Sequence, residues 1–329
     1  MALILANDGI DASGRKLLEI AGHMVITDKV AQSDLANFIT EKGVSALLVR
    51  SATEVTSNEL CTGKLKVVGR AGVGMDNIDL KQAEKLGIAV VNTPASSSRS
   101  VAELVMAHAL GLLRFLPESN RRMPESGNTS FGKLKKAFAE GREVEGRTMG
   151  IIGFGRIGRC TAQLALGMGM KVIAYDPSVK ECSISLTIHG FGIVSVPIAL
   201  HSLPEVLTQS DVISLHVPKP KNGAVIGTDE FAIMKSGAIV INASRGGVID
   251  EEALIEALNS GKVAGAGLDV FESEPEPGSR ILKHPRISLT PHIGASTQEA
   301  QERIGIELAE KVLEVLGRKI GRASCRERV

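Results

Sequence analysis

The chain has 329 residues, of which 43% are hydrophobic and 23% charged, with a formal net charge of +1 at pH 7. These values suggest a globular protein of about two domains and give no reason to expect a nucleic acid or an anionic membrane as partner. Residues 1–7 do not resemble a signal peptide and no apolar run reaches about 18 residues, so we expect a cytoplasmic protein. The four cysteines have no paired spacing, and we expect neither a disulfide framework nor a metal.

Short apolar runs alternate with helical patterns along residues 2–91. The expected strands are residues 2–6, 24–27, 46–49, 65–68 and 88–91, and the expected helices are residues 12–21, 32–41, 56–61 and 80–86. Strands that alternate with helices through short connections form a parallel sheet covered on both faces. No glycine-rich phosphate-binding loop follows the opening strand, and we expect a flavodoxin-like strand order.

A long apolar helix is expected at residues 98–116. Its apolar residues cover more than one face, so it must be buried broadly, either between domains or against another subunit. Pro117 should end or kink this helix near Leu116. The stretch 124–145 is polar and rich in Gly, Lys and Glu, and we expect a connection there rather than a core element.

The most informative stretch is residues 148–176. An apolar run leads into GFGRIG at residues 153–158, a helical pattern follows, and a second apolar run ends at Asp176. Gly153 permits a tight turn, Gly155 lets the backbone approach a pyrophosphate, and Gly158 lets helix and strand pack closely. The helix N-terminus opposes the negative charge of a diphosphate, and Asp176 would accept hydrogen bonds from the adenosine ribose. Because Asp176 has no adjacent arginine, the pattern predicts a Rossmann domain that binds NAD rather than NADP.

The second alternating unit continues to about residue 291. Residues 181–200 contain two β-rich segments separated by two glycines and predict a β-hairpin. The later strands are expected at residues 212–217, 238–241, 263–270 and 287–289, and the later helices at residues 203–207, 228–234, 251–259 and 298–316. The tail at residues 318–329 has no periodicity, and we expect it to be disordered.

Three loops after strands carry the candidate chemistry. Arg245 stands between a buried strand and two glycines, where its guanidinium can hold a carboxylate through paired, charge-assisted hydrogen bonds. Residues 268–275 contain three acids after a strand, and His292 follows Pro291 at another strand end. Each feature alone has an ordinary structural explanation. Together they supply a substrate anchor, an acid–base group and a carboxylate that orients it.

Several motifs in one order resemble the D-isomer-specific 2-hydroxyacid dehydrogenase family over residues 1–317, and within it the short D-3-phosphoglycerate dehydrogenases. They are GRAGVGMDNID at 69–79, NTP at 92–94, SVAEL at 100–104, GFGRIGR at 153–159, NASRGGVIDEEAL at 242–254, GLDVFESEP at 267–275 and TPHIGAST at 290–297. Two departures concern the hairpin, which is longer than usual, and residues 221–223, where many members have a threonine.

The resemblance implies a role for each site residue. Arg245 would bind the substrate carboxylate and carbonyl oxygen, His292 would take the hydroxyl proton as hydride leaves C2, and Glu274 would stabilise the imidazolium. The implied cofactor-binding residues are Gly153, Gly155, Arg156, Ile157, Gly158, Asp176, His216, Val217, Pro218, Ala243, Ser244, Asp269 and Gly294, with Asp269 on the nicotinamide carboxamide. The implied substrate-binding residues are Arg50, Ser51, Arg70, Val73 and Gly74, with Arg50 and Arg70 as candidates either for a substrate phosphate or for ordinary salt bridges.

The resemblance also implies an α/β fold with two doubly wound parallel-sheet domains. A discontinuous flavodoxin-like substrate domain would comprise residues 1–97 and 294–317, and a Rossmann NAD-binding domain residues 98–293, which would pack against a twin subunit in a homodimer. The implied reaction is the NAD-dependent oxidation of a D-2-hydroxy acid, most closely 3-phospho-D-glycerate to 3-phosphohydroxypyruvate in serine biosynthesis. The alternatives are a glyoxylate/hydroxypyruvate reductase, a D-lactate dehydrogenase and, from another class, an NAD(H)-sensing corepressor.

Overall fold

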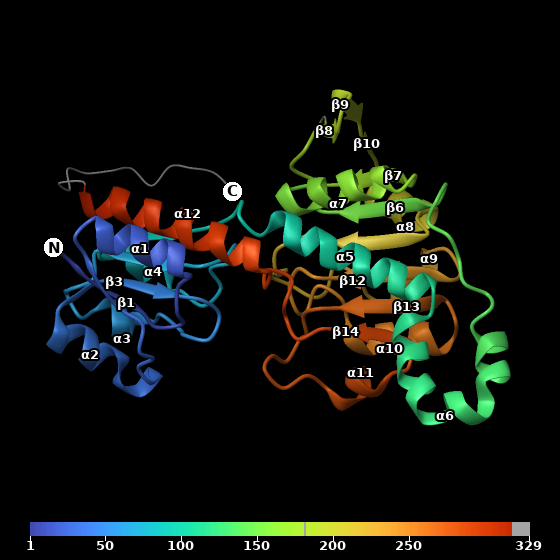
Figure 1. The fold of residues 1–329 in the computed structure, drawn as a ribbon, viewed down its shortest axis with the longest axis horizontal. Coiled ribbons are helices and arrows are strands. Elements are labelled where there is room, and N and C mark those ends of the chain that lie inside the picture. Colours follow the sequence, from blue (N-terminus) through green and yellow to red (C-terminus); the bar gives the residue numbers. More distant parts are fainter. Residues whose placement is uncertain (181, 318–329) are drawn as a thin grey trace. The chain divides into compact units, whose positions relative to one another are not determined.

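The computed structural model describes residues 1–180 and 182–317, which divide into two compact units (Figure 1). One unit combines Met1–Ser97 with the chain from Ala295 onward, and the other is Ser98–Gly294. Each unit contains its own parallel sheet, which confirms the predicted α/β class with two doubly wound domains. The disorder predicted for residues 318–329 concerns a stretch outside the described residues.

The first unit has a five-stranded parallel sheet in the order β2-β1-β3-β4-β5, the flavodoxin-like order. Its strands are β1 (Leu3–Ala6), β2 (Met24–Ile26), β3 (Val44–Val49), β4 (Val67–Arg70) and β5 (Ala89–Asn92). Its helices are α1 (Ala12–Ile20), η1 (Gln32–Asp34), α2 (Leu35–Lys42), α3 (Ser57–Leu60), α4 (Leu80–Lys85) and α12 (Gln298–Gly317). Helix α12 packs against α1 because both carry a glycine at the crossing: a Cβ at Gly14 would lie 2.3 Å from the carbonyl oxygen of Gly305.

The second unit has a seven-stranded sheet in the order β10-β7-β6-β11-β12-β13-β14, with all neighbouring pairs parallel. Its strands are β6 (Thr148–Ile152), β7 (Lys171–Tyr175), β10 (Ala199–Leu200), β11 (Val212–Leu215), β12 (Ala238–Asn242), β13 (Val263–Leu268) and β14 (Ile287–Leu289). Its connecting helices are α7 (Arg156–Gly167), α8 (Leu203–Gln209), α9 (Thr228–Ile233), α10 (Glu251–Asn259) and α11 (Ser279–Lys283). This is the Rossmann order with one additional strand. The strands predicted to reach residues 217 and 270 end two residues earlier, at Leu215 and Leu268, which leaves His216 and Asp269 in loops.

Helix α5 (Ser98–Leu113) is buried along most of its length, against α7 and against β12 and β13. Helix α6 (Leu116–Ala137) then begins with Pro117 in its first turn. The connection predicted at residues 124–145 is therefore wrong up to Ala137. The polar composition is that of an exposed helix, in which Leu134 is the buried residue, and charged pairs such as Glu118 with Arg122 support it.

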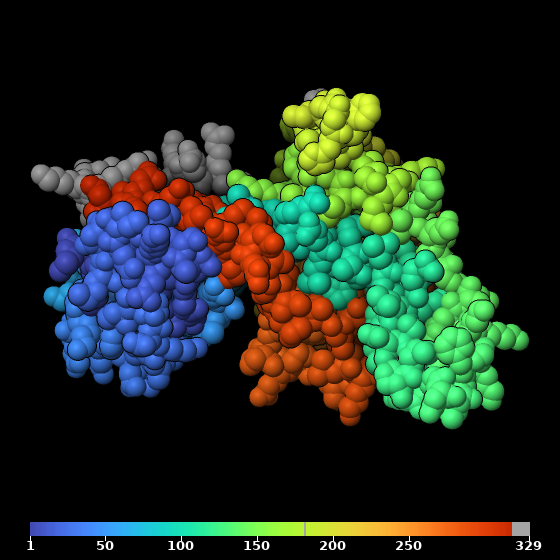
Figure 2. All heavy atoms as spheres, in the orientation of Figure 1, coloured from blue at the N-terminus to red at the C-terminus, as the bar shows by residue number. Residues whose placement is uncertain are grey.

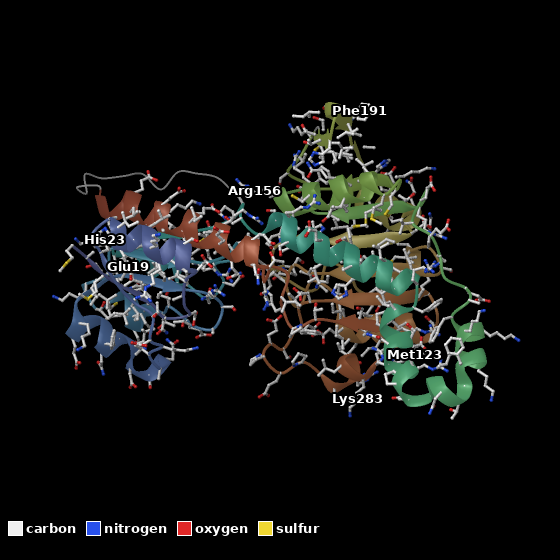
Figure 3. The ribbon with its side chains drawn as sticks, viewed as in Figure 1. Glu19, His23, Met123, Arg156, Phe191 and Lys283 are labelled. Carbon is white, nitrogen blue, oxygen red and sulfur yellow. The ribbon has the colours of Figure 1, made fainter. Side chains whose placement is uncertain are left out.

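The predicted hairpin is confirmed as β8 (Ser183–Ile188) paired antiparallel with β9 (Gly192–Pro197). It projects from the second unit (Figure 2, yellow) and carries Phe191 at its tip, labelled in Figure 3, with 88% of that residue exposed. Within residues 1–180 and 182–317, no single helix has the length and apolarity to cross a membrane. By length and composition alone, α5 and α6 together, bent by 57°, pass the same test.

Candidate active site

The glycine corner between β6 and α7 has three glycines in three different environments. Gly153 has a φ of 93°, and a Cβ there would lie 2.4 Å from the carbonyl oxygen of His216. A Cβ at Gly158 would lie 2.2 Å from the carbonyl oxygen of Gly153. A Cβ at Gly155 would meet nothing within 4 Å. The first and last glycines are therefore required by the protein's own packing, whereas Gly155 faces open space at the beginning of a helix.

This corner fits the diphosphate of a dinucleotide. Gly155 is the N-cap of α7 and has no side chain to satisfy the first N–H groups of the helix, including those of Arg156 and Ile157. Those N–H groups and the helix dipole favour an anion at this place. Figure 3 labels Arg156 at the beginning of α7. An open approach at Gly155, combined with a helix N-terminus, is what a bound pyrophosphate requires.

Asp176 follows β7 and orders the glycine corner. Its Oδ2 accepts a hydrogen bond from the N–H of Phe154 at 2.7 Å, and its Oδ1 accepts one from the N–H of Ser178 at 2.8 Å. A carboxylate has about four acceptor positions, so these bonds leave capacity for ribose hydroxyl groups. The acid predicted to select NAD therefore also holds the backbone of the phosphate-binding turn.

His216 lies directly after β11, followed by Val217 and Pro218. Its Nε2 lies 2.9 Å from Ser214 Oγ and 3.2 Å from Thr161 Oγ1, and burial lowers its pKa to about 3. The imidazole is therefore neutral at physiological pH. Because its carbonyl oxygen also touches Gly153, His216 supports the glycine corner from the neighbouring strand.

Arg245 lies in the loop after β12, next to Ala243 and Ser244. The side chain of Asn242 ties this loop together: its Nδ2 donates to the carbonyl of Arg245 at 2.9 Å, and its Oδ1 accepts from the N–H of Ser244 at 3.0 Å. Gly246 lies against the segment after β13, since a Cβ there would be 1.7 Å from the carbonyl oxygen of Phe271. The structure thus brings the Arg245 loop against the backbone that leads to Glu274.

Glu274 and His292 form a hydrogen-bonded pair, with Glu274 Oε2 at 2.8 Å from His292 Nδ1. Glu274 Oε1 accepts a hydrogen bond from the N–H of Phe271 at 3.0 Å, which fixes the carboxylate. Both side chains are partly exposed, at 37% and 42%. The pair comes from loops after β13 and β14, at the carboxyl edge of the same sheet that carries the glycine corner.

Asp269 is only 1% exposed and organises the loop that carries His292. Its Oδ1 accepts hydrogen bonds from Thr290 Oγ1 at 2.6 Å and from the N–H of Ile293 at 2.8 Å, and its Oδ2 accepts the N–H of Gly294 at 2.8 Å. One acceptor position remains, on Oδ2, for a group such as the predicted carboxamide. His292 itself has a φ of 54°, a left-handed conformation that side chains rarely adopt.

No sequence pattern pointed to His108, which contacts the residue before this loop and the strand that leads to it. His108 is on α5 and 4% exposed, with Nδ1 at 2.8 Å from Ser288 Oγ and Nε2 at 3.2 Å from Thr290 Oγ1. A lone histidine on an apolar helix is an ordinary core residue, and its partners lie some 180 positions along the chain. A pattern based on local spacing cannot find such a contact.

The predicted substrate residues lie in the first unit, at the carboxyl ends of β3 and β4. Arg50 follows Val49, which pairs with Arg70 across the parallel ladder, so the two arginines leave neighbouring strands at the same edge. Asp8 holds the turn by accepting the N–H of Arg50 at 2.7 Å. The Nε of Arg50 is buried and has no hydrogen-bond partner among the described residues. The neighbouring Ser51 is exposed.

The loop after β4 exposes backbone to the same edge. Gly72 has a φ of 152°, and the Nη1 of Arg70 occupies the space where its Cβ would be. Asn92 Nδ2 donates to the carbonyl of Val73 at 2.7 Å, while the N–H groups of Val73 and Gly74 have no acceptor among residues 1–180 and 182–317. Backbone N–H groups of this kind can donate to an anionic group, and Val73 and Gly74 are among the residues expected to bind the substrate.

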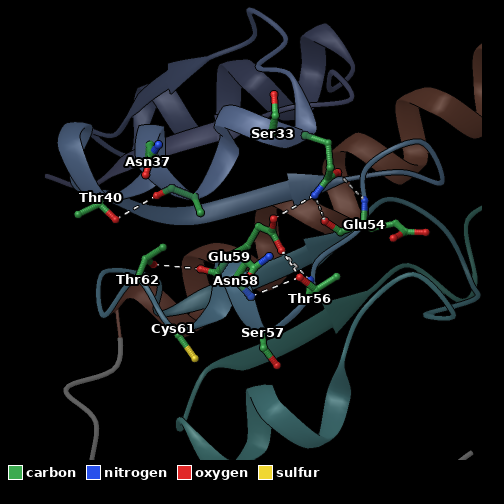
Figure 4. A pocket seen from close by; sticks show the side chains of 12 residues that line it. Ser33, Asn37, Thr40, Glu54, Thr56, Ser57, Asn58, Glu59, Cys61 and Thr62 are labelled. Carbon is green, nitrogen blue, oxygen red and sulfur yellow. Dashed lines mark hydrogen bonds between the residues drawn. The ribbon is translucent and has the colours of Figure 1, made fainter.

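A separate groove in the first unit, between α2 and α3, contains none of the predicted site residues (Figure 4). Its most buried acid, Glu59, accepts hydrogen bonds from the backbone N–H of Thr56 at 2.8 Å and from Gln32 Nε2 at 3.0 Å. These bonds cap α3 and join it to the preceding loop. The groove therefore has a structural explanation.

Comparisons with known proteins agree with this geometry. The family model described as D-isomer specific 2-hydroxyacid dehydrogenase, NAD binding domain, matches residues 106–294. The chain is 43% identical over 317 residues to a hydroxypyruvate reductase of Thermotoga maritima, covering 94% of this chain and 97% of the relative. It is 40% identical over 319 residues to a D-3-phosphoglycerate dehydrogenase of Methanocaldococcus jannaschii, covering 96% of this chain but only 58% of that relative.

A solved structure of a glyoxylate reductase from Paecilomyes thermophila has a TM-score of 0.80 at 27% identity and covers 96% of this chain and 95% of its own. The family model spans more than half of the described chain, and the Thermotoga maritima relative matches it almost from end to end. Residues 106–294, which the family model matches, contain the glycine corner, Arg245, Asp269, Glu274 and His292. The chain therefore belongs to the D-isomer specific 2-hydroxyacid dehydrogenase family and carries its NAD-binding domain.

Proposed function

We propose that this protein oxidises 3-phospho-D-glycerate to 3-phosphohydroxypyruvate, with NAD as the hydride acceptor. The observation that carries the dehydrogenase part is the pair of His292 and Glu274 at 2.8 Å, at the strand ends of the sheet that also carries the glycine corner. An imidazole fixed by a carboxylate is a suitable acid–base group for the proton of a hydroxyl.

In this proposal each residue acts at a stated atom. His292 uses Nδ1 to bind Glu274, so its Nε2 takes the proton from the C2 hydroxyl. NAD, when bound, accepts the hydride from C2, so the products are a 2-oxo acid, NADH and a protonated His292. Glu274 stabilises the imidazolium that forms, and Arg245 holds the substrate carboxylate through paired hydrogen bonds.

Arg50 and Arg70 support the proposal that the substrate carries a phosphate group. Two guanidinium groups leave neighbouring strands at one sheet edge, and the buried Nε of Arg50 lacks a partner among the described residues. Arginine binds phosphate through two parallel hydrogen bonds, so an arginine pair is well suited to a phosphate ester. Relatives named D-3-phosphoglycerate dehydrogenase, at 37% and 40% identity, also favour this substrate.

A hydroxypyruvate reductase is the second candidate. The Thermotoga maritima relative with that name is 43% identical, and this chain spans 97% of it, whereas the chain spans only 54% and 58% of the two D-3-phosphoglycerate dehydrogenases. A D-lactate dehydrogenase and an NAD(H)-sensing corepressor remain less favoured alternatives, and the corepressor would bind NADH without turnover.

Steady-state kinetics separate these candidates. NADH would be followed with 3-phosphoglycerate, 3-phosphohydroxypyruvate, hydroxypyruvate, glyoxylate and D-lactate. We expect Arg50→Gln and Arg70→Gln to raise KM for the phosphorylated substrates at least tenfold and to leave KM for hydroxypyruvate within twofold. Arg15→Gln, which removes an exposed arginine paired with Glu19, is the control. A higher kcat/KM for hydroxypyruvate than for its phosphorylated form would transfer the proposal to the second candidate.

We also propose that the enzyme acts in serine biosynthesis, in the cytoplasm and as a homodimer that forms through the Rossmann unit. Helix α6 supports the dimer, because its polar segments expose Leu116 and Met123 before the kink at Ser130 and Phe131 after it. Light scattering of the purified protein should give twice the 34.7 kDa of one chain. A monomeric mass at micromolar concentration would contradict the dimer.

A further inference from the structure

The side chain of His108 packs against β13 at a position where the strand has a glycine. A Cβ at Gly267 would lie 2.7 Å from the Cβ of His108 and 2.9 Å from its Cγ, and a Cβ at Gly265 would lie 3.0 Å from the side chain of Leu112 one turn later. The two glycines thus let α5 approach the sheet closely at both residues. Any side chain at residue 267 would displace the imidazole.

The hydrogen bonds of His108 have a single consistent direction. Thr290 Oγ1 has one hydrogen, and it donates that hydrogen to Asp269 Oδ1 at 2.6 Å because a carboxylate only accepts. The oxygen of Thr290 must then accept from His108 Nε2, at 3.2 Å, which places the histidine proton on Nε2. Nδ1 consequently accepts from the hydroxyl of Ser288, at 2.8 Å. Every bond in this chain points towards the carboxylate of Asp269, and bonds aligned in this way strengthen one another.

Asp269, the last acceptor in this series of hydrogen bonds, holds the backbone next to His292. Asp269 accepts the N–H groups of Ile293 and Gly294, which follow His292 directly. The left-handed φ of 54° at His292 is a conformation that persists only where surrounding contacts impose it. The orientation of His292 therefore depends on where the Asp269 carboxylate lies.

We propose that His108 is a positioning residue: as a neutral donor to Thr290 it fixes Asp269, and through Asp269 it holds the loop that presents His292 to the substrate. This inference rests on the proposed catalytic role of His292. The hydrogen bonds of His108 to described residues go to Ser288 and Thr290 and not to Glu274 or His292, so we expect its effect to reach the reaction through the loop. Small errors in the placement of an acid–base group reduce turnover strongly, whereas the glycine corner that binds the cofactor is held by other contacts.

Three substitutions of His108 separate hydrogen bonding from packing. His108→Gln places a donor near the position of Nε2 and should keep kcat within threefold of the wild type. His108→Asn reaches only the position of Nδ1, and His108→Leu has no donor, so both should lower kcat at least tenfold. They should raise the Kd for NADH by a smaller factor, because Asp269 would be only one of the contacts of the cofactor. Equal kcat in the Leu variant and the wild type, or equal losses in all three variants, would overturn the proposal.

Thr290 gives an independent test if a His108 variant fails to fold. Thr290→Val removes the hydroxyl that links His108 to Asp269, and Thr290→Ser retains it, so the loss of kcat should appear in the first variant and be rescued in the second. Leu112→Ala is the matched control, because it disturbs the same contact between α5 and β13 without a polar bond; it should lower the unfolding temperature and leave kcat within twofold. If Leu112→Ala lowered kcat as much as His108→Leu, the effect of His108 would have to be assigned to packing.

Nitrogen NMR of ¹⁵N-labelled histidine tests the chain of hydrogen bonds without any assay. We expect His108 to be neutral with its proton on Nε2 at pH 7, since burial lowers its pKa, although the charge of Asp269 opposes this effect. A proton on Nδ1 would overturn the inference. If the wild type turned over none of the hydroxy acids, the proposed function would fail, while the NMR result would still decide the direction of the hydrogen bonds.

Discussion

Glu274 divides its carboxylate between two partners: Oε2 lies 2.8 Å from His292 Nδ1, and Oε1 accepts the N–H of Phe271 at 3.0 Å. The backbone bond prevents the carboxylate from rotating, so the imidazole is held in one orientation. Because Nδ1 is occupied, Nε2 is the nitrogen available for proton transfer. The pair thereby determines both the direction of the imidazole and the tautomer.

The first prediction concerns this pair. His292→Ala should lower kcat by about a thousandfold, within the range typical of a lost general base. Glu274→Gln should lower kcat by about 100-fold or more, because its single amide oxygen cannot accept from both Phe271 and His292. An NH2 group that faces Nδ1 donates to it, which leaves the ring proton on Nε2, and the amide no longer stabilises the imidazolium charge. The Kd for NADH, measured by fluorescence, should stay within threefold in both variants. More than a tenth of wild-type turnover in His292→Ala would remove His292 from the mechanism.

The second prediction uses two glycines of the same helix. A Cβ at Gly155 or at Gly167 meets nothing within 4 Å, so neither Gly→Ala substitution should disturb folding. The Gly155 methyl group would occupy the approach to the N-terminus of α7, and Gly155→Ala should weaken NADH binding at least tenfold. Gly167→Ala, at the other end of α7, should leave the Kd unchanged and add up to about 1 kcal/mol of helix stability.

Calorimetric titration with NADH and thermal unfolding would measure both effects. Equal affinities in Gly155→Ala and Gly167→Ala would show that the diphosphate does not bind at this corner.

The third prediction concerns the choice of cofactor. Asp176 places a carboxylate beside the glycine corner, and that charge repels the extra phosphate of NADP. We expect kcat/KM to be at least tenfold higher with NAD than with NADP. Asp176→Ser should narrow this ratio, and it should also reduce efficiency with NAD because Phe154 loses the acceptor of its N–H. Equal efficiencies with the two cofactors in the wild type would refute the role assigned to Asp176.

The sequence was sufficient for features that depend on local spacing. Buried parallel strands appear as short apolar runs, and the glycine spacing lies within residues 153–158, so both sheets and the cofactor corner could be predicted, whereas the contact of Gly153 with His216 could not. Helix α6 could not be predicted, because a helix with little buried surface has no apolar stripe and resembles a loop in composition.

Contacts between distant residues were likewise beyond the sequence. Asp269 was expected at the cofactor, and nothing in its neighbourhood indicated that its carboxylate also holds Thr290, Ile293 and Gly294. His108 meets Thr290 only because α5 packs against β13 and β14, where Gly267 leaves room for the imidazole. Such contacts can be identified only from the three-dimensional structure.

The fourth prediction is a pH dependence of stability that comes from His216. Burial lowers the pKa of this imidazole from 6.5 to about 3, so between these values the folded protein keeps it neutral while the unfolded chain protonates it. The unfolded state then binds more protons, and the free energy of unfolding falls as pH decreases below about 6.5. At pH 5 the loss should be about 2 kcal/mol, since one pKa unit corresponds to about 1.4 kcal/mol.

The variant His216→Gln tests this prediction, because it keeps a donor for Thr161 and cannot titrate. Urea unfolding at pH 7 and pH 5 should show that the free energy of unfolding of the wild type falls by about 2 kcal/mol more than that of the variant. His189→Gln, which removes an exposed histidine of the hairpin, is the control and should behave as the wild type. An equal drop in the wild type and in His216→Gln would mean that this imidazole is accessible to protons in the folded protein.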